Sequence, residues 1–173
     1  MVKILLLSAC CFFLFFQGSK AQVEPNIVNA AHAYARAQIN SDIESILGFT
    51  HPGLIEQAGG LENMKKTLLM IHQNQHEKGI KLQDFRVREP IQHTRSNGEI
   101  HALVPVVTTS KVPGGQLINE TNLIAVSEGD ADRWYFIETT SIDERNVIKV
   151  LENWDGTLIL PFKKAPVFKE DKK

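Results

Sequence analysis

The sequence predicts an α+β domain in which N-terminal helices pack on a curved antiparallel sheet, followed by a short C-terminal helix and a tail. Apolar residues recur at steps of three and four over residues 25–75, which is typical of amphipathic helices. Beyond residue 82 they recur at every second position, and glycine-containing turns separate the alternating segments. Helices followed by consecutive strands favour an α+β architecture over alternating α/β units.

Residues 1–21 predict a signal peptide. Lys3 precedes an apolar run over residues 4–16, and the small residues Ser19 and Ala21 favour cleavage after Ala21. The run is shorter than the roughly 20 residues that cross a bilayer, so we expect no permanent membrane span. We therefore expect export to the periplasm or the extracellular space.

One alternative concerns Cys10, because Leu7-Ser8-Ala9-Cys10 resembles a bacterial lipobox and would make the protein a lipoprotein. The apolar residues after Cys10 argue against it, since a lipidated cysteine is normally followed by a polar tether. The sequence has 2 cysteines, Cys10 and Cys11, so the chain after Ala21 cannot form a disulfide. The net charge is −1, and no predicted helix or strand carries a basic cluster, so we expect no nucleic-acid partner.

Four helical segments are expected before the sheet. The first runs over Pro25–Ile39, since a proline suits a first helical turn, and Asn40-Ser41-Asp42 ends it and caps a short second segment. A third turn follows His51-Pro52-Gly53 and stops at Gly59-Gly60. The fourth, Leu61–Gln75, carries an apolar stripe formed by Leu61, Met64, Leu68 and Ile71.

Four strands are then expected in an antiparallel meander. They cover residues 82–94, 100–108, 117–126 and 134–137. The turns between them are Ser96-Asn97-Gly98, Pro113-Gly114-Gly115 and residues 129–132. Leu103, Pro105 and Val107 make the second face of one strand apolar as well, so we expect a homodimer through the outer sheet face.

The C-terminal part predicts a short helix and a tail. Ser141-Ile142-Asp143-Glu144 fits a capping box, and Val147, Ile148 and Leu151 follow at helical spacing. We expect a single domain over residues 22–160 and a disordered charged tail over residues 161–173.

The order and spacing of these segments, over about residues 24–140, resemble the nuclear transport factor two-like superfamily, also called cystatin-like or polyketide-cyclase-like, in a secreted bacterial form. The resemblance is carried by the first amphipathic helix, Asn40-Ser41-Asp42, Phe49-Thr50-His51-Pro52, Gly59-Gly60 and the closing Trp134-Tyr135-Phe136. It implies a cone-shaped domain whose helices and bent sheet enclose a pocket. The superfamily contains isomerases, cyclases, dehydratases and binding domains, and many members are dimers, so the fold alone does not assign a function.

The candidate pocket residues are Tyr34, His51, Trp134, Phe136 and Glu138. His51 can act as a general base or simply cap a turn, because a histidine without a placed partner specifies neither. Tyr34 lies on the apolar stripe, where a core position with its hydroxyl at a polar edge is the simpler interpretation. Trp134, Phe136 and Glu138 share one face of the last strand, which suits either a ligand contact or core packing. Asp84 is a further strand carboxylate.

His72 and His76 are four residues apart on one helix face. This spacing can bind a metal, but the H-E-x-x-H glutamate is absent, so a solvated face is favoured and we expect no metal or cofactor.

Two functions are favoured at this point, and a third, an interaction subunit with a filled core, stays open if the outer sheet face is a large apolar patch. The first is an exported pocket domain that binds a small apolar or amphipathic ligand or a protein partner, favoured because no complete catalytic set can be assembled. The second is an enzyme of the isomerase, dehydratase or cyclase type with a pocket histidine or carboxylate as general base. Convergence of two or more of Tyr34, His51, Asp84 and Glu138 in one cavity would favour the enzyme.

Overall fold

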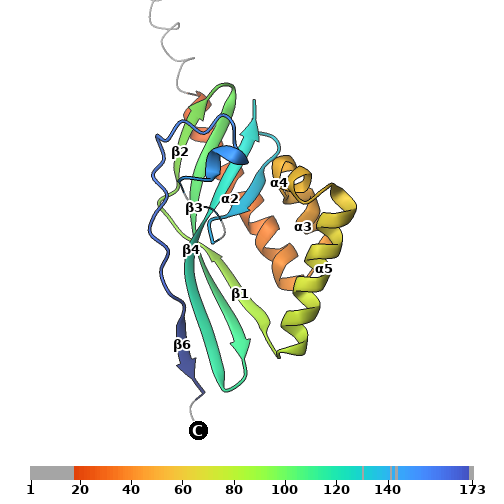
Figure 1. The fold of residues 1–173 in the computed structure, drawn as a ribbon. Helices are drawn as coiled ribbons and strands as arrows, with labels where there is room; N and C mark the ends of the chain where they lie inside the picture. Colours follow the sequence, from red (N-terminus) through yellow and green to blue (C-terminus); the bar gives the residue numbers. More distant parts are fainter. Residues whose placement is uncertain (1–17, 130, 141, 143, 172–173) are drawn as a thin grey trace, which may run out of the picture.

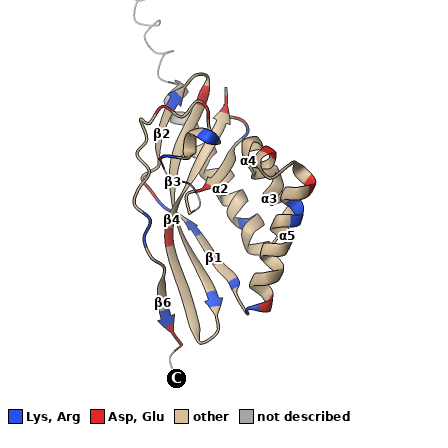
Figure 2. Ribbon diagram, viewed as in Figure 1, with Lys and Arg blue, Asp and Glu red and all other residues tan. Residues whose placement is uncertain are grey.

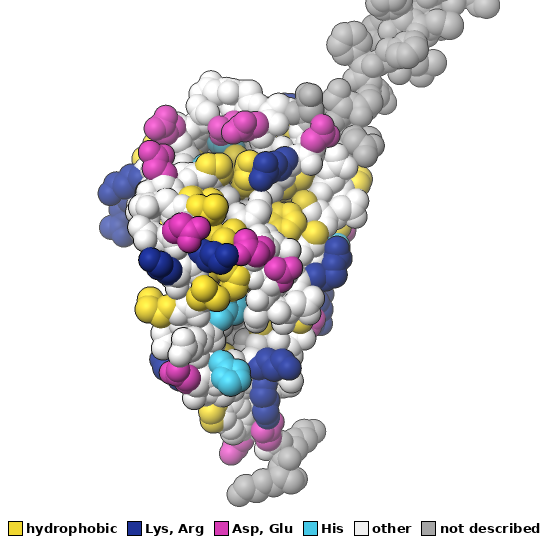
Figure 3. All heavy atoms as spheres, turned by 90° about the vertical axis from the view of Figure 1, so that its right-hand side faces the viewer, with side chains coloured by type: hydrophobic (Ala, Val, Ile, Leu, Met, Phe, Trp, Pro, Cys, Tyr) yellow, Lys and Arg dark blue, Asp and Glu magenta, His cyan; other side chains and the backbone are white. Residues whose placement is uncertain are grey.

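The computed structural model describes residues 18–129, 131–140, 142 and 144–171. It confirms the expected α+β class, with four N-terminal helices packed against a six-stranded antiparallel sheet (Figure 1). The elements are α2 (Gly18–Asn40), α3 (Ile43–Phe49), α4 (Pro52–Gln57), α5 (Leu61–Glu77), β1 (Lys81–Val87), β2 (Gln92–Ser96), β3 (Glu99–Val112), β4 (Gly115–Glu128), β5 (Tyr135–Glu138), the 3₁₀ turn η1 (Val147–Lys149) and β6 (Val167–Glu170). The apolar core of the expected signal peptide and Cys10 lie outside the described residues. Figure 3 shows the molecule narrowing toward one end.

Two long central strands organise the sheet, and each is flanked by two short strands placed end to end. β3 and β4 pair over their whole length. β1 and β2 share the other edge of β3, while β5 and β6 share the other edge of β4. The expectation of one strand over residues 82–94 is therefore wrong. Pro90, which has no N–H to donate, lies in the break between β1 and β2.

Pro105 lies in the middle of the central strand β3, although a proline has no backbone N–H to donate to a neighbouring strand. The backbone N–H of Arg88 donates to the carbonyl of Pro105 at 2.8 Å, so the carbonyl of Pro105 points toward the break between β1 and β2. The N and O atoms of one strand residue point to the same side, so the missing N–H of Pro105 also faces this break. The sequence thus places its proline where the ladder does not require a donor.

The helix α2 contributes six buried residues to the inner core, the apolar cluster between the helices and the sheet. Ile27, Ala31, Tyr34 and Ala35 are buried against the sheet, which confirms the stripe expected from their spacing. The helix begins at Gly18 rather than at Pro25, so Pro25 lies inside it and cannot donate the hydrogen bond of that turn. The expected cleavage position after Ala21 falls within this helix.

The helix α5 lies at the edge of the fold. None of its residues is buried, and Leu61, Leu69, Met70 and Ile71 are exposed. Its main contacts are with α3 and α4 rather than with the strands. The expectation that its apolar stripe packs on the sheet therefore holds only for Leu68, which is partly buried against the inner core.

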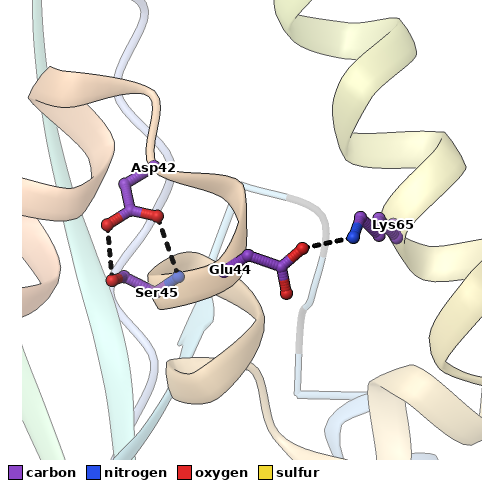
Figure 4. Close-up of polar contacts among 4 residues, drawn as sticks. All are labelled: Asp42, Glu44, Ser45 and Lys65. Carbon is purple, nitrogen blue, oxygen red and sulfur yellow. Dashed lines mark hydrogen bonds and ion pairs between the residues drawn. The ribbon is translucent and has the colours of Figure 1, made fainter.

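Polar contacts at the start of α3 fix the turn after α2 and reach α5 (Figure 4). The Asp42 carboxylate accepts hydrogen bonds from the backbone N–H of Ser45 at 3.2 Å and from its hydroxyl at 2.6 Å. These bonds make Asp42 the N-cap that the sequence predicts. Glu44 forms an ion pair with Lys65 of α5, and since both side chains are solvated this pair adds little stability.

The segment after β5 covers the outer face of the sheet. Leu103, Ile124, Val126 and Ile137 of the strands pack against a second group on this segment, and together they form the outer cluster. The second group consists of Ile142, Val147, Leu151, Trp154 and Leu158. The ring of Trp154 stacks on buried His101, with centroids 5.5 Å apart. At these strand positions the chain itself occupies the place where a partner subunit was expected.

Two expectations for the C-terminal part are wrong. The expected helix near Val147 is only a 3₁₀ turn of 3 residues, and residues 141 and 143 of its capping box lie outside the described part. Residues 167–170, expected to be disordered, form β6 against Gly115–Ile118 of β4. All four side chains of β6 are exposed, so backbone pairing rather than burial holds this strand.

Gly115 is required for the pairing of β6. A Cβ at this position would overlap the Lys169 carbonyl oxygen and lie 2.8 Å from ring atoms of Phe168. We expect Gly115→Ala to detach β6 and raise amide hydrogen exchange over residues 167–170 at least about tenfold, while the free energy of unfolding changes by about 1 kcal/mol or less. Gly48→Ala is the control, because nothing lies within 4 Å of a Cβ there. Unchanged protection of β6 in Gly115→Ala would contradict this account.

Acidic and basic positions are interspersed over the described helices, strands and C-terminal segment (Figure 2). Among the described residues, no helix combines the length and apolar character that crossing a membrane requires.

Candidate functional site

A pocket of about 450 Å³, here called the inner pocket, opens between the C-terminal end of α2, the helix α5 and the inner face of the sheet. Figure 1 shows how these three elements face one another. Its apolar wall is formed by Ile39, Leu82, Phe85, Val106 and Leu123. Because α5 rests on α3 and α4, the sheet beneath α5 is left partly uncovered. The pocket is thus a direct consequence of the way α5 packs.

Glu138, at the end of β5, presents its carboxylate to the inner pocket. The hydroxyl of Tyr34 donates to Glu138 Oε1 at 3.3 Å, and Gln38 Nε2 donates to the hydroxyl oxygen of Tyr34 at 2.6 Å. Tyr34 and Gln38 are one helical turn apart on α2, so the helix itself aligns these two donors. The result is a relay of hydrogen bonds that starts at an amide and ends at a carboxylate facing the pocket.

The ring of Tyr34 is fixed by aromatic neighbours. It stacks on Phe136 with centroids 5.1 Å apart, and it meets Phe49 and Phe85 edge-on at 6.0 Å each. The side chain is 5% exposed, so Tyr34 is a core residue with its hydroxyl at a polar edge. The aromatic packing holds the hydroxyl in place beneath Glu138.

Burial affects both groups of this pair. Desolvation raises the pKa of Glu138 above its usual 4.5, although hydrogen bonds from Tyr34 and Thr140 oppose the rise. Desolvation, followed by the nearby Glu138 charge, raises the pKa of Tyr34 well above 10.0. The Glu138 side chain is nevertheless exposed to solvent. Glu138 is therefore a carboxylate that both solvent and a ligand in the pocket can reach.

Polar groups that the sequence did not single out as pocket residues complete the lining. Asn119 and Thr121 of β4 lie on the same face as Leu123, and Gln38 follows Tyr34 by one helical turn. Extending the alternation of β4 back from Leu123 would have identified both strand residues. His72 and His76, interpreted above as a solvated face, also line the pocket, and Figure 3 shows histidine side chains at the surface on this side.

His51 does not belong to the inner pocket. Its Nδ1 accepts a hydrogen bond from the backbone N–H of Gly53 at 3.1 Å, which makes it the N-cap of α4. It lies beside Glu99 in a separate shallow hollow, and burial lowers its pKa. A neutral ring that accepts at Nδ1 suits the capping role. The structure therefore places His51 and Glu138 apart.

The other candidates divide between core and surface. Trp134 and Phe136 are buried in the inner core on the face that Glu138 also uses, but neither lines the inner pocket. Asp84 forms an ion pair with Arg86 at 2.7 Å on the surface of β1. Of the four residues named for convergence, Tyr34 and Glu138 meet. Within the described part of the chain, no group of three or more ligand-type side chains is placed to hold a metal ion.

Removing the charge of Glu138 should change how stability depends on pH. Its raised pKa means that the folded protein binds more protons than the unfolded chain between the two pKa values, so stability falls as pH rises through this interval. Glu138→Gln lacks this titration. Its free energy of unfolding, relative to the wild type, should therefore rise as pH increases above the unfolded pKa of a glutamate, about 4.3, as measured by urea denaturation at a series of pH values.

Glu120→Gln is a matched control of opposite sign. An ion pair with Lys164 lowers the pKa of Glu120, so this carboxylate contributes stability that is present above its unfolded pKa and is lost on acidification. The stability of Glu120→Gln relative to the wild type should thus fall as pH rises. Parallel pH profiles for the two variants would contradict the environment assigned to Glu138.

Comparison with protein-family models, with curated proteins and with solved structures finds no match for this chain.

Proposed function

We propose that this chain is an exported binding domain that holds a small amphipathic ligand in the inner pocket. The observation that carries the proposal is a pocket of about 450 Å³ that combines one apolar wall with polar side chains and one anchored carboxylate, Glu138. Ligand sites are typically concave and mostly apolar, with a few fixed polar groups that orient the ligand. Export rests on the signal-peptide pattern of residues 1–21.

The superfamily assignment belongs to the same proposal. Helices on one face of a bent antiparallel sheet, with a pocket between them, support membership of the nuclear transport factor two-like superfamily in a divergent form. The C-terminal segment on the outer face and the added strand β6 are departures from that pattern. A homodimer through the outer face would have to contact this segment, so the monomer–dimer state in solution is a separate measurement.

Blocking the inner pocket tests the binding function. Thr108 is a half-buried residue of β3 that lines the pocket, and Thr109 points to the opposite face. We expect Thr108→Trp to weaken binding of the neutral apolar dye N-phenyl-1-naphthylamine at least about tenfold, because the indole fills the space that the dye needs. The measurement is a fluorescence titration of the purified protein.

Thr109→Trp is the matched control, with the same substitution on the same strand and outside the pocket. It should bind the dye like the wild type. Absence of dye binding to the wild type, or equal loss in both variants, would overturn the proposed function.

A second candidate function has one specific observation in its favour. Tyr34 and Glu138 lie within hydrogen-bond distance at the pocket, and burial raises the pKa of Glu138, as in a general base for proton abstraction next to a carbonyl group. Of these two residues, however, only Glu138 lines the pocket, and the Tyr34 hydroxyl already donates its hydrogen to Glu138. Hydrogen–deuterium exchange at the α-carbons of methyl pentyl ketone, followed by NMR, tests this function. Exchange by the wild type and not by Glu138→Gln would support the enzyme over the binding domain.

A further inference from the structure

We infer that the end of the outer sheet face next to β6 binds the surface of an anionic phospholipid bilayer. Exposed apolar side chains enter the headgroup layer, and the lysine and arginine side chains around them contact the lipid phosphates. This surface lies on the other side of the sheet from the inner pocket, so the inference does not rest on the ligand binding proposed above.

The outer cluster covers only one end of the outer sheet face. Its strand members Leu103 and Ile124 lie where β3 and β4 pair with β2 and β5. Toward the other end, the same face of β3 continues with Pro105 and Val107. These two residues line an open groove of about 490 Å³, and the segment that leads to β6 runs along it (Figure 1). We call this end of the sheet, together with that segment, the basic face.

Three large apolar side chains of the basic face are exposed to solvent. Phe162 is 99% exposed, Ile159 is 73% exposed and Val167 is 57% exposed. Ile159 and Phe162 line the groove. Val167 pairs with Ile118, which lies on the outer face because it is six positions from Ile124 on the same strand. Exposed apolar side chains that gather in one place mark an interaction surface.

Basic side chains surround these apolar ones, and Figure 2 shows such positions on β1, on β6 and on the segment before β6. Some of them line the groove, and the strand register places the others on the outer face. Together they are Arg86, Arg88, Lys111, Lys163, Lys164 and Lys169.

Carboxylates offset only part of this charge. The ion pairs of the basic face join Arg86 to Asp84, Lys111 to Asp171 and Lys164 to Glu120. Within the described part of the chain, the other three basic residues of the face form no ion pair, although Lys163 donates a hydrogen bond to the carbonyl of Thr140. Glu89 follows Arg88 in the chain, and even with it the basic residues outnumber the acidic ones. The basic face therefore keeps an excess of positive charge.

An anionic bilayer matches both properties of the basic face. It attracts lysine and arginine through its surface charge, and it offers an apolar layer beneath the phosphates. A lysine can keep its ammonium group at the phosphates while its hydrocarbon stem lies along apolar surface. A nucleic acid would offer the charge, but it has no apolar layer to receive Ile159 and Val167. A second copy of the chain would bring two positive faces together, which is unfavourable.

Cosedimentation with large unilamellar vesicles tests the inference. The protein is purified in the form that the expressing cell exports. One set of vesicles contains equal parts of phosphatidylglycerol and phosphatidylcholine, and the other contains phosphatidylcholine alone. We expect binding to the anionic vesicles to be at least about tenfold tighter, because about 1 kcal/mol per basic residue corresponds to about fivefold each. Raising the salt from about 0.1 M to about 0.5 M should weaken it.

Two variants of the basic face separate its apolar and charged parts. Phe162→Ser should weaken binding to the anionic vesicles at least about fivefold, because the ring no longer enters the headgroup layer. The double variant Lys163→Ala with Lys169→Ala should weaken it at least about tenfold. Phe162 and Lys169 are exposed, so the fold does not depend on these side chains.

Matched controls lie on the helix side of the sheet. Met70→Ser removes a side chain of α5 that is 59% exposed, and Lys66→Ala with Lys78→Ala removes the same net charge from exposed positions. Both should bind the anionic vesicles like the wild type.

Three results would overturn the inference. The first is equal binding to the two kinds of vesicle, and the second is an equal effect of the basic-face variants and their controls. The third is tighter binding to a single-stranded oligonucleotide than to the anionic vesicles, unchanged by Phe162→Ser, which would identify a nucleic-acid surface instead. None of these results bears on dye binding in the inner pocket, so that function is tested separately.

Discussion

Trp154→Ala should lower the free energy of unfolding by about 3 to 5 kcal/mol, the range for truncating a large buried aromatic side chain. Trp154 is 9% exposed, stacks on His101 and belongs to the outer cluster. Its loss would open a cavity over the strands and weaken the packing of the whole segment after β5 against the sheet. Urea denaturation at equilibrium is the measurement.

Ile148→Ala is the matched control on the same segment. Ile148 is 52% exposed, so its truncation should change the free energy of unfolding by about 0.5 kcal/mol or less. Similar small effects for both variants would mean that the segment does not rest on the sheet as described.

Tyr34→Ala should have an effect of the same size, about 3 to 5 kcal/mol, for a different reason. The ring of Tyr34 contacts Phe49, Phe85 and Phe136, so its removal empties the centre of the inner core. It also takes away the hydroxyl that donates to Glu138. Thermal and urea denaturation both report the loss.

Tyr34→Phe separates the two contributions, because it keeps the ring and removes the hydroxyl. We expect a loss of about 1 to 2 kcal/mol, since the hydrogen bonds with Gln38 and Glu138 disappear while the packing stays. If Tyr34→Phe were as unstable as Tyr34→Ala, the hydrogen-bond relay rather than the aromatic packing would dominate at this position.

Local sequence patterns predicted the fold well at positions where the residue type has one strong conformational preference. Asn97-Gly98 and Gly114-Gly115 lie at the two hairpins that delimit β3, and Asp42 caps α3. The alternation in β3 and β4 also identified the central pair of strands. These features depend only on residues within a few positions of one another, so the sequence alone is enough to predict them.

The missed features depend on partners distant in sequence. The sequence of Val167–Glu170 does not by itself predict a strand. These residues pair with β4 because Gly115 has no Cβ that would overlap them. The stripe of α5 predicted burial, yet helix α5 packs on α3 and α4, and the inner pocket results. Tyr34 and Glu138 were each named as candidates, but their contact joins residues 104 positions apart. Tertiary packing alone decides such contacts.

The end-to-end arrangement of the short strands leaves part of β4 as an edge of the sheet. β5 pairs with β4 only from Leu123 onward, and β6 pairs with it only up to Ile118. On its other side the same stretch of β4 still pairs with β3, and β1 continues the sheet from Val106. The open edge is short, because the backbone N–H of Thr139 donates to the carbonyl of Asn122 at 3.1 Å. Residues 119–122 are all polar or charged, and such side chains on an edge disfavour pairing with the edge of another sheet.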